Sequence, residues 1–267
     1  VLILLVLTPL GIESHGARRW IRIPGIGLQV QPAEVAKLCM ILCLAVLVCK
    51  MGKGIRTMKG FILMMAVPAP IVLLIKVATN NLSSAIIAGA ALLVFLVANA
   101  DSLDGFRLNR IQVWLNPESD SQGVGFQTMQ GLYAIGSGGI WGKGLGQSMQ
   151  KLNFLPEAQN DMIFSIICEE LGLFGAIAII LMFIMLIWRM MIIANNAPDL
   201  FGAMLVVGVI GHIAIQAILN IAVVTNSVPN TGISLPFISY GGSSVMFLLI
   251  EIGLVLSVAK NIQLKEL

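Results

Sequence analysis

Residues 151–175 read KLNFLPEAQNDMIFSIICEELGLFG and join a glycine-rich polar segment to a long apolar run. This stretch carries four carboxylates, at Glu157, Asp161, Glu169 and Glu170. Acidic side chains beside or inside a membrane span are costly, and they are candidates for function by default. Because Glu157 and Asp161 precede the apolar run, we expect water and a polar substrate to reach these two carboxylates first.

The composition identifies a membrane protein with several spans. Of the 267 residues, 58% are hydrophobic and 11% are charged, and the mean hydropathy is +0.95. Soluble domains carry about 25% charged residues, so a soluble enzyme with a single anchor is excluded. The net charge of +3 gives no reason to expect a nucleic acid as a partner.

The apolar runs predict an all-α bundle, since a membrane helix needs about 20 mostly apolar residues. We expect one domain over residues 1–267 with about six full spans and an extracytoplasmic loop at about 100–160. A partial span at 1–12 indicates a helix whose beginning precedes this sequence. The full spans are predicted at residues 32–49, 61–78, 82–98, 162–188, 201–224 and 244–260.

The charge pattern predicts the orientation of these spans. Residues 50–60 carry four basic side chains and no acid, which indicates a cytoplasmic loop and places 13–31 outside. The last span ends at Lys260 and Lys265, which also indicates the cytoplasm. Counting between these two points leaves one crossing missing between residues 99 and 120.

Four positions or pairs can carry chemistry, and each also has a structural interpretation. Asp161 is either a general base at a wet pocket or an acid that interacts with the helix dipole. Glu34 and Lys37 form either a pocket wall or a local ion pair at i, i+3. Arg18 and Arg19 either bind a phosphate or contact lipid headgroups. Gly241 and Gly242 either bind an anion through backbone amides or only permit a tight loop.

Two further patterns have simpler interpretations. His212, Gln216 and Asn220 lie on one face of a predicted span, where we expect hydrogen bonds between helices. The glycine-rich run GSGGIWGKGLG lacks the spacing of a phosphate-binding loop, so we expect no ATP site and interpret it as flexible backbone.

Several motifs together carry a family resemblance. They are GARRWI at 16–21, QPAEVAK at 31–37, GSGGIWGKGLGQSMQKL at 136–152, LPEAQNDMIF at 155–164 followed by EELG, and LPFISYGGSS at 235–244. In this order they resemble the SEDS family of peptidoglycan polymerases, FtsW, RodA and SpoVE, and the FtsW/SpoVE branch most. Family members have ten spans, so the resemblance implies that the first two spans and the seventh are missing here.

The resemblance implies a peptidoglycan glycosyltransferase that polymerises lipid II at the outer face of the cytoplasmic membrane during cell division. It assigns catalysis to Asp161, with Glu157 beside it. The same motifs supply substrate-binding candidates, which are Arg18, Arg19, Glu34, Lys37, Lys151, Ser239, Gly241 and Gly242. The alternatives are a lipid II flippase or transporter, and a non-catalytic scaffold of the division complex.

The resemblance also implies partners and allows a metal. A class B penicillin-binding protein, other division proteins and membrane lipids are the expected partners, at the division septum. No cofactor is firmly expected, although Glu34 is a candidate ligand for Mg²⁺ or Mn²⁺. Where relatives read QPDLGTA, this chain reads TNNLSSA, so Asn81 replaces an acid that would serve a cation.

Overall fold

The computed structural model describes residues 11–14, 17–22, 29–51, 113–119, 123–152 and 155–262, with single positions at 62, 66, 69 and 70. Side chains in the first two of these segments are described only for Ile21. Most of the predicted span at 61–78, the whole of that at 82–98, most of the partial span at 1–12, Asn81 and most of the interval with the missing crossing lie outside the described residues.

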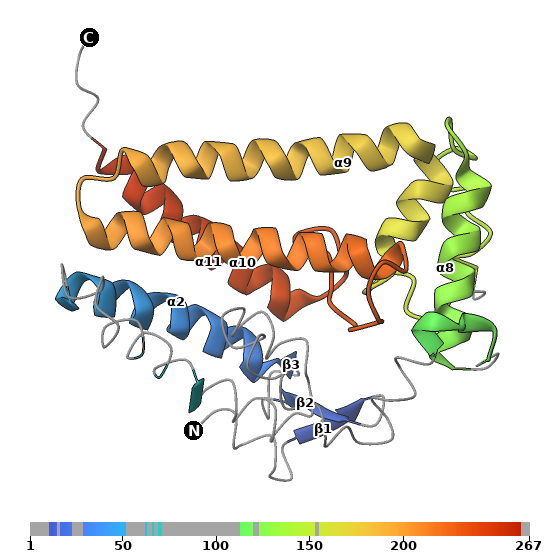
Figure 1. Cartoon of the computed structure of the whole chain (residues 1–267), viewed down its shortest axis with the longest axis horizontal. Helices are drawn as coiled ribbons and strands as arrows, with labels where there is room; N and C mark the ends of the chain where they lie inside the picture. Colours follow the sequence, from blue (N-terminus) through green and yellow to red (C-terminus); the bar gives the residue numbers. More distant parts are fainter. Residues whose placement is uncertain are drawn as a thin grey trace. The chain divides into compact units, whose positions relative to one another are not determined.

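Within the described residues, four helices are long and apolar enough to cross a membrane (Figure 1). They are α2 (Pro32–Met51), α9 (Ile163–Asn195), α10 (Leu200–Val224) and α11 (Gly242–Lys260). Each begins within two residues of a predicted span, and α9 continues past the predicted end at 188. These four span predictions are confirmed.

The ends of α2 show why the sequence forms a helix there. Pro32 occupies its first position, where no backbone N–H is needed. Glu34 lies in the first turn and Lys50 in the last, and both charges interact favourably with the helix dipole.

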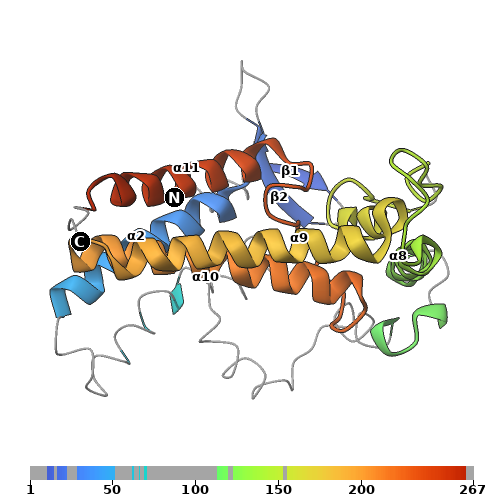
Figure 2. The ribbon, with the colours of Figure 1, turned by 90° about the horizontal axis from the view of Figure 1, so that it is seen from above.

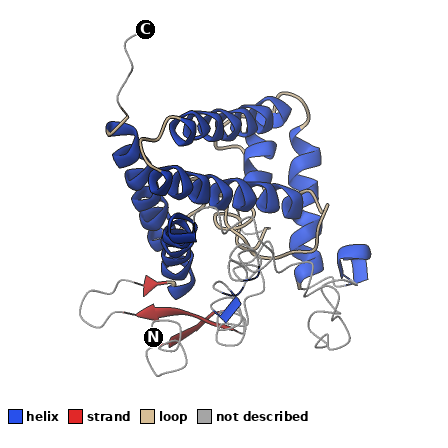
Figure 3. Cartoon of the chain, turned by 60° about the vertical axis from the view of Figure 1, so that its left-hand side comes forward, coloured by secondary structure: helices blue, strands red, loops and turns tan. Residues whose placement is uncertain are grey.

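A small antiparallel sheet precedes α2, in a region that the sequence analysis treated as a loop at the membrane interface. Its strands, red in Figure 3, are β1 (Gly11–Ser14), β2 (Ala17–Arg22) and β3 (Gln29–Val30), in the order β1-β2-β3. Ile21 pairs with Gly11 on one side and Val30 on the other, and its side chain is buried. Pairing on both sides makes β2 the central strand.

The chain divides into two compact units. The first comprises residues 1–98, 188–212 and 242–267, and the second comprises residues 99–187 and 213–241. The first unit therefore contains the sheet, α2 and α11. The second contains α8 (Val124–Gly138), the N-terminal part of α9 and the C-terminal part of α10.

In the first unit, a polar pair joins α10 to α11. His212 Nδ1 lies 2.8 Å from a Glu251 carboxylate oxygen, and both side chains are buried. This contact confirms the hydrogen bond between helices that the sequence predicted for His212. Gly208, one turn earlier on α10, faces Ile41 of α2, where a side chain would collide.

In the second unit, α8 packs closely against the beginning of α9. The sequence indicates a polar loop at residues 124–138 and does not predict this helix. Gly131 lies against Ser165, Ala134 is fully buried, and Gly138 lies against the backbone of Cys168. Small residues at this spacing let two helix backbones approach each other. Figure 2 shows α8 nearly end-on, with the loop at 139–152 beside it.

This packing predicts different effects for two nearby glycines of α8. In Gly138→Ala the added Cβ would collide with the Cys168 carbonyl, so we expect a loss of about 1–3 kcal/mol from overpacking. Gly136 has open space around it, so Gly136→Ala is expected to preserve or slightly raise stability. Thermal unfolding of both variants in detergent tests the packing, and equal behaviour of the two would contradict it.

α9 is broken at Gly172, which has φ 65° and ψ −159° (Figure 1). The break frees backbone carbonyls of the preceding turn, and the loop at 139–152 uses them. Lys143 N donates to Glu169 O and Gly144 N donates to Glu170 O, each at 2.9 Å. Gly142 and Gly172 meet backbone to backbone, so neither position has room for a Cβ.

Candidate active site

Asp161 lies in the turn that leads into α9, two residues before the helix begins. Its side chain is half-buried. Gln127 of α8 donates from Nε2 to Asp161 Oδ1 and to the carbonyl of Pro156, both at 3.3 Å. One carboxylate oxygen is therefore oriented by a neutral donor from a neighbouring helix.

The orientation of Gln127 is itself fixed by a second amide. Asn230 Nδ2 donates to Gln127 Oε1 at 3.1 Å. Because Oε1 accepts this bond, the NH₂ group of Gln127 has to face Asp161. The sequence analysis named neither amide, since no spacing distinguishes Gln127 from other polar residues in its segment.

The loop after α10 completes the surroundings of Asp161. Asn220, fully buried on α10, donates to the Asp161 carbonyl at 2.8 Å and to the Ile233 carbonyl at 2.6 Å. Gly232 is close enough that a Cβ there would lie 3.7 Å from Asp161 Oδ2. The backbone of Tyr240 donates to Gln159 O at 2.8 Å, so the motifs LPEAQND and PFISYGG are joined directly.

Glu157 occupies the same turn, four residues before Asp161. Its backbone has a positive φ of 53°, and its carboxylate accepts a hydrogen bond from Asn160 Nδ2. The side chain is half-buried. Both predicted catalytic carboxylates therefore lie in one short turn at the beginning of a membrane helix, where a polar substrate can approach.

Of the predicted substrate-binding residues, Lys151 and Ser239 make contacts within the protein. Lys151 Nζ lies 2.6 Å from Glu170 Oε1. Ser239 is buried, and its hydroxyl accepts a hydrogen bond from Leu235 N at 2.7 Å. Gly241 immediately precedes α11 and Gly242 is its first residue, with open space around the Cβ position of Gly242.

The remaining candidates belong to the first unit. Glu34 Oε1 and Lys37 Nζ lie 2.8 Å apart and are both buried, so the geometry shows the local ion pair that the sequence allowed. Arg18 and Arg19 lie in β2, where Arg18 pairs with Glu13 of β1 in register. The side chains of these two arginines lie outside the described residues.

The described part of the chain contains no set of side chains that could hold a metal ion. No group of three or more His, Cys, Asp or Glu side chains gathers there. Glu34 contacts Lys37 instead of further carboxylates, so the described residues do not fit a bound Mg²⁺ or Mn²⁺. A metal at Glu34 stays a prediction, and no step below depends on it.

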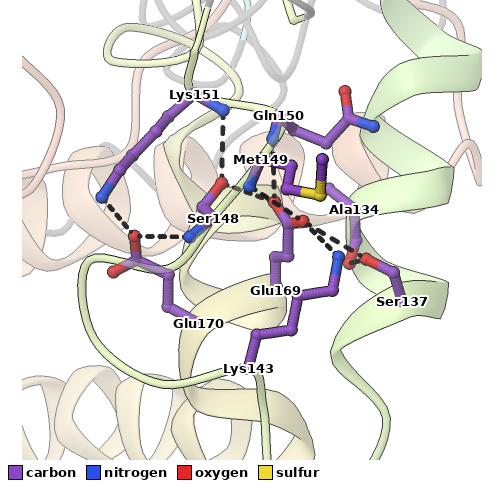
Figure 4. Close-up of polar contacts among 9 residues, drawn as sticks. All are labelled: Ala134, Ser137, Lys143, Ser148, Met149, Gln150, Lys151, Glu169 and Glu170. Atoms are coloured by element: carbon purple, nitrogen blue, oxygen red, sulfur yellow. Dashed lines mark hydrogen bonds and ion pairs between the residues drawn. The ribbon is translucent and has the colours of Figure 1, made fainter.

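The other two carboxylates of the opening stretch bind the loop at 139–152 (Figure 4). Glu169 is fully buried and accepts hydrogen bonds from Lys143 Nζ at 2.6 Å, from the Ser148 hydroxyl and from two backbone amides. Glu170 accepts from Lys151 Nζ at 2.6 Å and from Ser148 N. Glu169 and Glu170 therefore bind the loop to α9, whereas Glu157 and Asp161 lie in the turn that precedes α9.

Comparisons with known proteins agree with the motifs. The chain matches the family model of FtsW, RodA and SpoVE, described as cell cycle protein, over residues 1–104 and 100–264. The match passes from one segment to the other at 100–104, within the interval where the predicted topology lacks a crossing. Together the two segments cover almost the whole chain.

Named relatives and solved structures also align with almost the whole of this chain. Stage V sporulation protein E of Bacillus subtilis is 41% identical over 97% of this chain and 76% of its own. A probable peptidoglycan glycosyltransferase FtsW of Trichlorobacter lovleyi is 38% identical over 100% of this chain and 75% of its own.

Two solved structures are similar in fold and sequence. A chain from a peptidoglycan synthase complex that coordinates polymerization and crosslinking aligns with TM-score 0.77 and 26% identity, over 99% of this chain and 79% of its own. The rod shape determining protein RodA of Thermus thermophilus aligns with TM-score 0.65 and 28% identity, over 98% of this chain and 76% of its own.

Proposed function

This chain belongs to the family of FtsW, RodA and SpoVE, and from that premise we propose that it is a peptidoglycan glycosyltransferase which polymerises lipid II into glycan strands. The observation that supports this proposal best is the setting of Asp161. Its carboxylate lies in the turn just before a membrane helix, and one carboxylate oxygen accepts a hydrogen bond from Gln127. A base placed there can meet a substrate whose lipid stays in the membrane and whose sugars stay in water.

The proposed reaction is a displacement at the anomeric carbon of the donor sugar. Asp161 takes the proton from a hydroxyl of the acceptor sugar, and that oxygen forms the new bond to the anomeric carbon. The bond from this carbon to the lipid pyrophosphate breaks, and its electron pair leaves with the pyrophosphate. Orienting the acceptor and stabilising the leaving group supply most of the rate in this scheme.

The basic candidates are assigned to the leaving pyrophosphate. Arg18 and Arg19 can match phosphate oxygens with their planar guanidinium groups. Lys37 offers a point charge, and its contact with Glu34 keeps that charge neutralised while no anion is bound. Glu157 is assigned to the acceptor side, because it shares a turn with Asp161.

A polymerisation assay with the purified protein tests this function. The protein is incubated with lipid II in detergent, without any penicillin-binding protein that polymerises glycan itself, and products are resolved on a gel. We expect glycan strands. A protein that moves fluorescent lipid II across a vesicle membrane and makes no strands would be a flippase. One that does neither, while folded, would be a scaffold.

The same relatives support a proposal for the partner and the location. The similar synthase complex couples polymerization to crosslinking, so we propose a class B penicillin-binding protein as the partner that crosslinks the new strands. We place the protein at the division septum with other division proteins, because the named relatives include FtsW and a sporulation protein. Its multi-pass membrane character is already evident from the span helices and the family.

A further inference from the structure

The loop at 139–152 presents large apolar side chains outward. We call the exposed set the apolar loop surface. Its members, each more than half exposed, are Ile140, Trp141, Leu145, Met149 and Leu152. Leaving such side chains in water forfeits about 25 cal/mol for each Å² of apolar area. Several large exposed apolar side chains on one short loop indicate an interaction surface.

The same loop shows no unpaired charge. Its charged residues are Lys143 and Lys151, and each ammonium group lies 2.6 Å from a carboxylate of α9 (Figure 4). The two lysine side chains are 33% and 36% exposed, and each keeps its counter-charge, Glu169 or Glu170, within contact. The cluster of two lysines and two glutamates is therefore formally neutral as a whole.

Several backbone amides of the loop are also paired within the protein. Amides of residues 142, 143 and 144 donate to carbonyls of α8 and α9 at 2.8–2.9 Å. Leu173 N donates back to Gly139 O at 3.0 Å, which closes the junction from the other side. Irregular backbone can enter a membrane only where its polar groups find partners, and these bonds supply partners for the amides closest to Trp141.

The apolar loop surface continues onto the side of α9. The rings of Trp141 and Phe174 have centroids 5.0 Å apart. Phe174 is 56% exposed and Leu173 is 53% exposed, and both belong to a helix long and apolar enough to span the membrane. The part of α9 that follows, which is exposed in the same way, is the part expected to face lipid.

We propose that the loop at 139–152 is a membrane-interface anchor whose apolar loop surface inserts into the lipid leaflet at the N-terminal end of α9. Trp141 would lie at the headgroup level, where tryptophan is enriched. Lipid is favoured over a protein partner because the surface is continuous with a membrane-facing helix and has no polar rim of unpaired charges. This inference does not depend on the proposed enzymatic activity.

Quenching of tryptophan fluorescence tests the anchor. The unchanged protein and Trp141→Phe are reconstituted in phosphatidylcholine vesicles, with and without bromine on the acyl chains, and the difference between the two proteins gives the emission of Trp141. We expect brominated lipid to remove most of this emission, and bromine near the headgroup to quench more than bromine near the chain end. Aqueous iodide is expected to leave it almost unchanged.

The variant and the controls make the result decisive. Phenylalanine at 141 keeps an aromatic ring against Phe174, so the fold is expected to survive. Trp188→Phe gives the matched signal for an exposed tryptophan of α9, which brominated lipid should quench in any case. Quenching of Trp141 by iodide and not by brominated lipid overturns the proposal. Protection from iodide that requires an added partner protein also overturns it, in favour of a protein interface.

Discussion

We expect the Asp161→Asn variant to polymerise lipid II about 10²- to 10⁴-fold more slowly than the unchanged protein, because this is the usual contribution of a general base. Asparagine has nearly the same shape, and its carbonyl oxygen can still accept the hydrogen bond from Gln127. The substitution therefore removes the ability to take a proton and leaves the packing intact. Initial rates of strand formation on a gel, at saturating lipid II, measure the effect.

Two further variants separate chemistry from structure. Asp161→Glu keeps the charge and moves the carboxylate by one methylene, so a base in fixed geometry should lose most of its activity. Gln127→Leu keeps Asp161 and removes the donor that orients it, and we expect a smaller loss. Strand formation by Asp161→Asn at the rate of the unchanged protein would remove Asp161 as the base.

The second large effect is expected at Glu169, on stability. Every group that faces this buried carboxylate is a donor, including Lys143, Ser148 and two backbone amides. Glu169→Gln would turn an NH₂ group toward these donors and leave Lys143 without its counter-charge. A buried polar group left without a partner costs about 1–3 kcal/mol, so we expect the loop at 139–152 to open.

Glu170→Gln is the matched control, because it changes the adjacent carboxylate in the same way. Glu170 pairs with a lysine whose side chain is 36% exposed, and exposed pairs contribute about 0–1 kcal/mol. Cys39, Cys43 and Cys49 are first replaced by alanine in all proteins, because none of the three is buried. A thiol-reactive dye then reads out both variants during heating, since buried Cys168 adjoins Glu169 and reacts once this region opens. Equal unfolding midpoints for the two variants would show that the buried carboxylate of Glu169 contributes no more to stability than the carboxylate of Glu170.

The sequence was sufficient for the elements whose signal is local. A run such as 244–260 predicts a span because nearly every residue is apolar, and α11 follows it closely. The i, i+3 spacing of Glu34 and Lys37 similarly allowed their ion pair as one of two interpretations. In both cases the responsible residues are neighbours along the chain, so no tertiary information is needed.

The features that were missed depend on residues distant in sequence. Gln127 and Asn230 are 103 residues apart and meet only after α8 packs against the beginning of α9. Lys151 contacts Glu170, 19 residues away across a loop, and its predicted binding of substrate stays a prediction. The run GSGGIWGKGLG was interpreted as flexible backbone, whereas Gly142 also provides a close backbone contact with Gly172. Such contacts leave no periodic trace in the sequence.

The break at Gly172 also solves a problem of length. α9 has 33 residues, and a straight helix of that size would measure about 50 Å, well beyond the bilayer's hydrocarbon core of about 30 Å. The portion after the break, residues 173–195, measures about 35 Å and matches that core with a modest tilt. Hydrophobic mismatch is thereby avoided, and the first two turns of α9, with their carboxylates, can stand among the lipid headgroups without thinning the membrane around them.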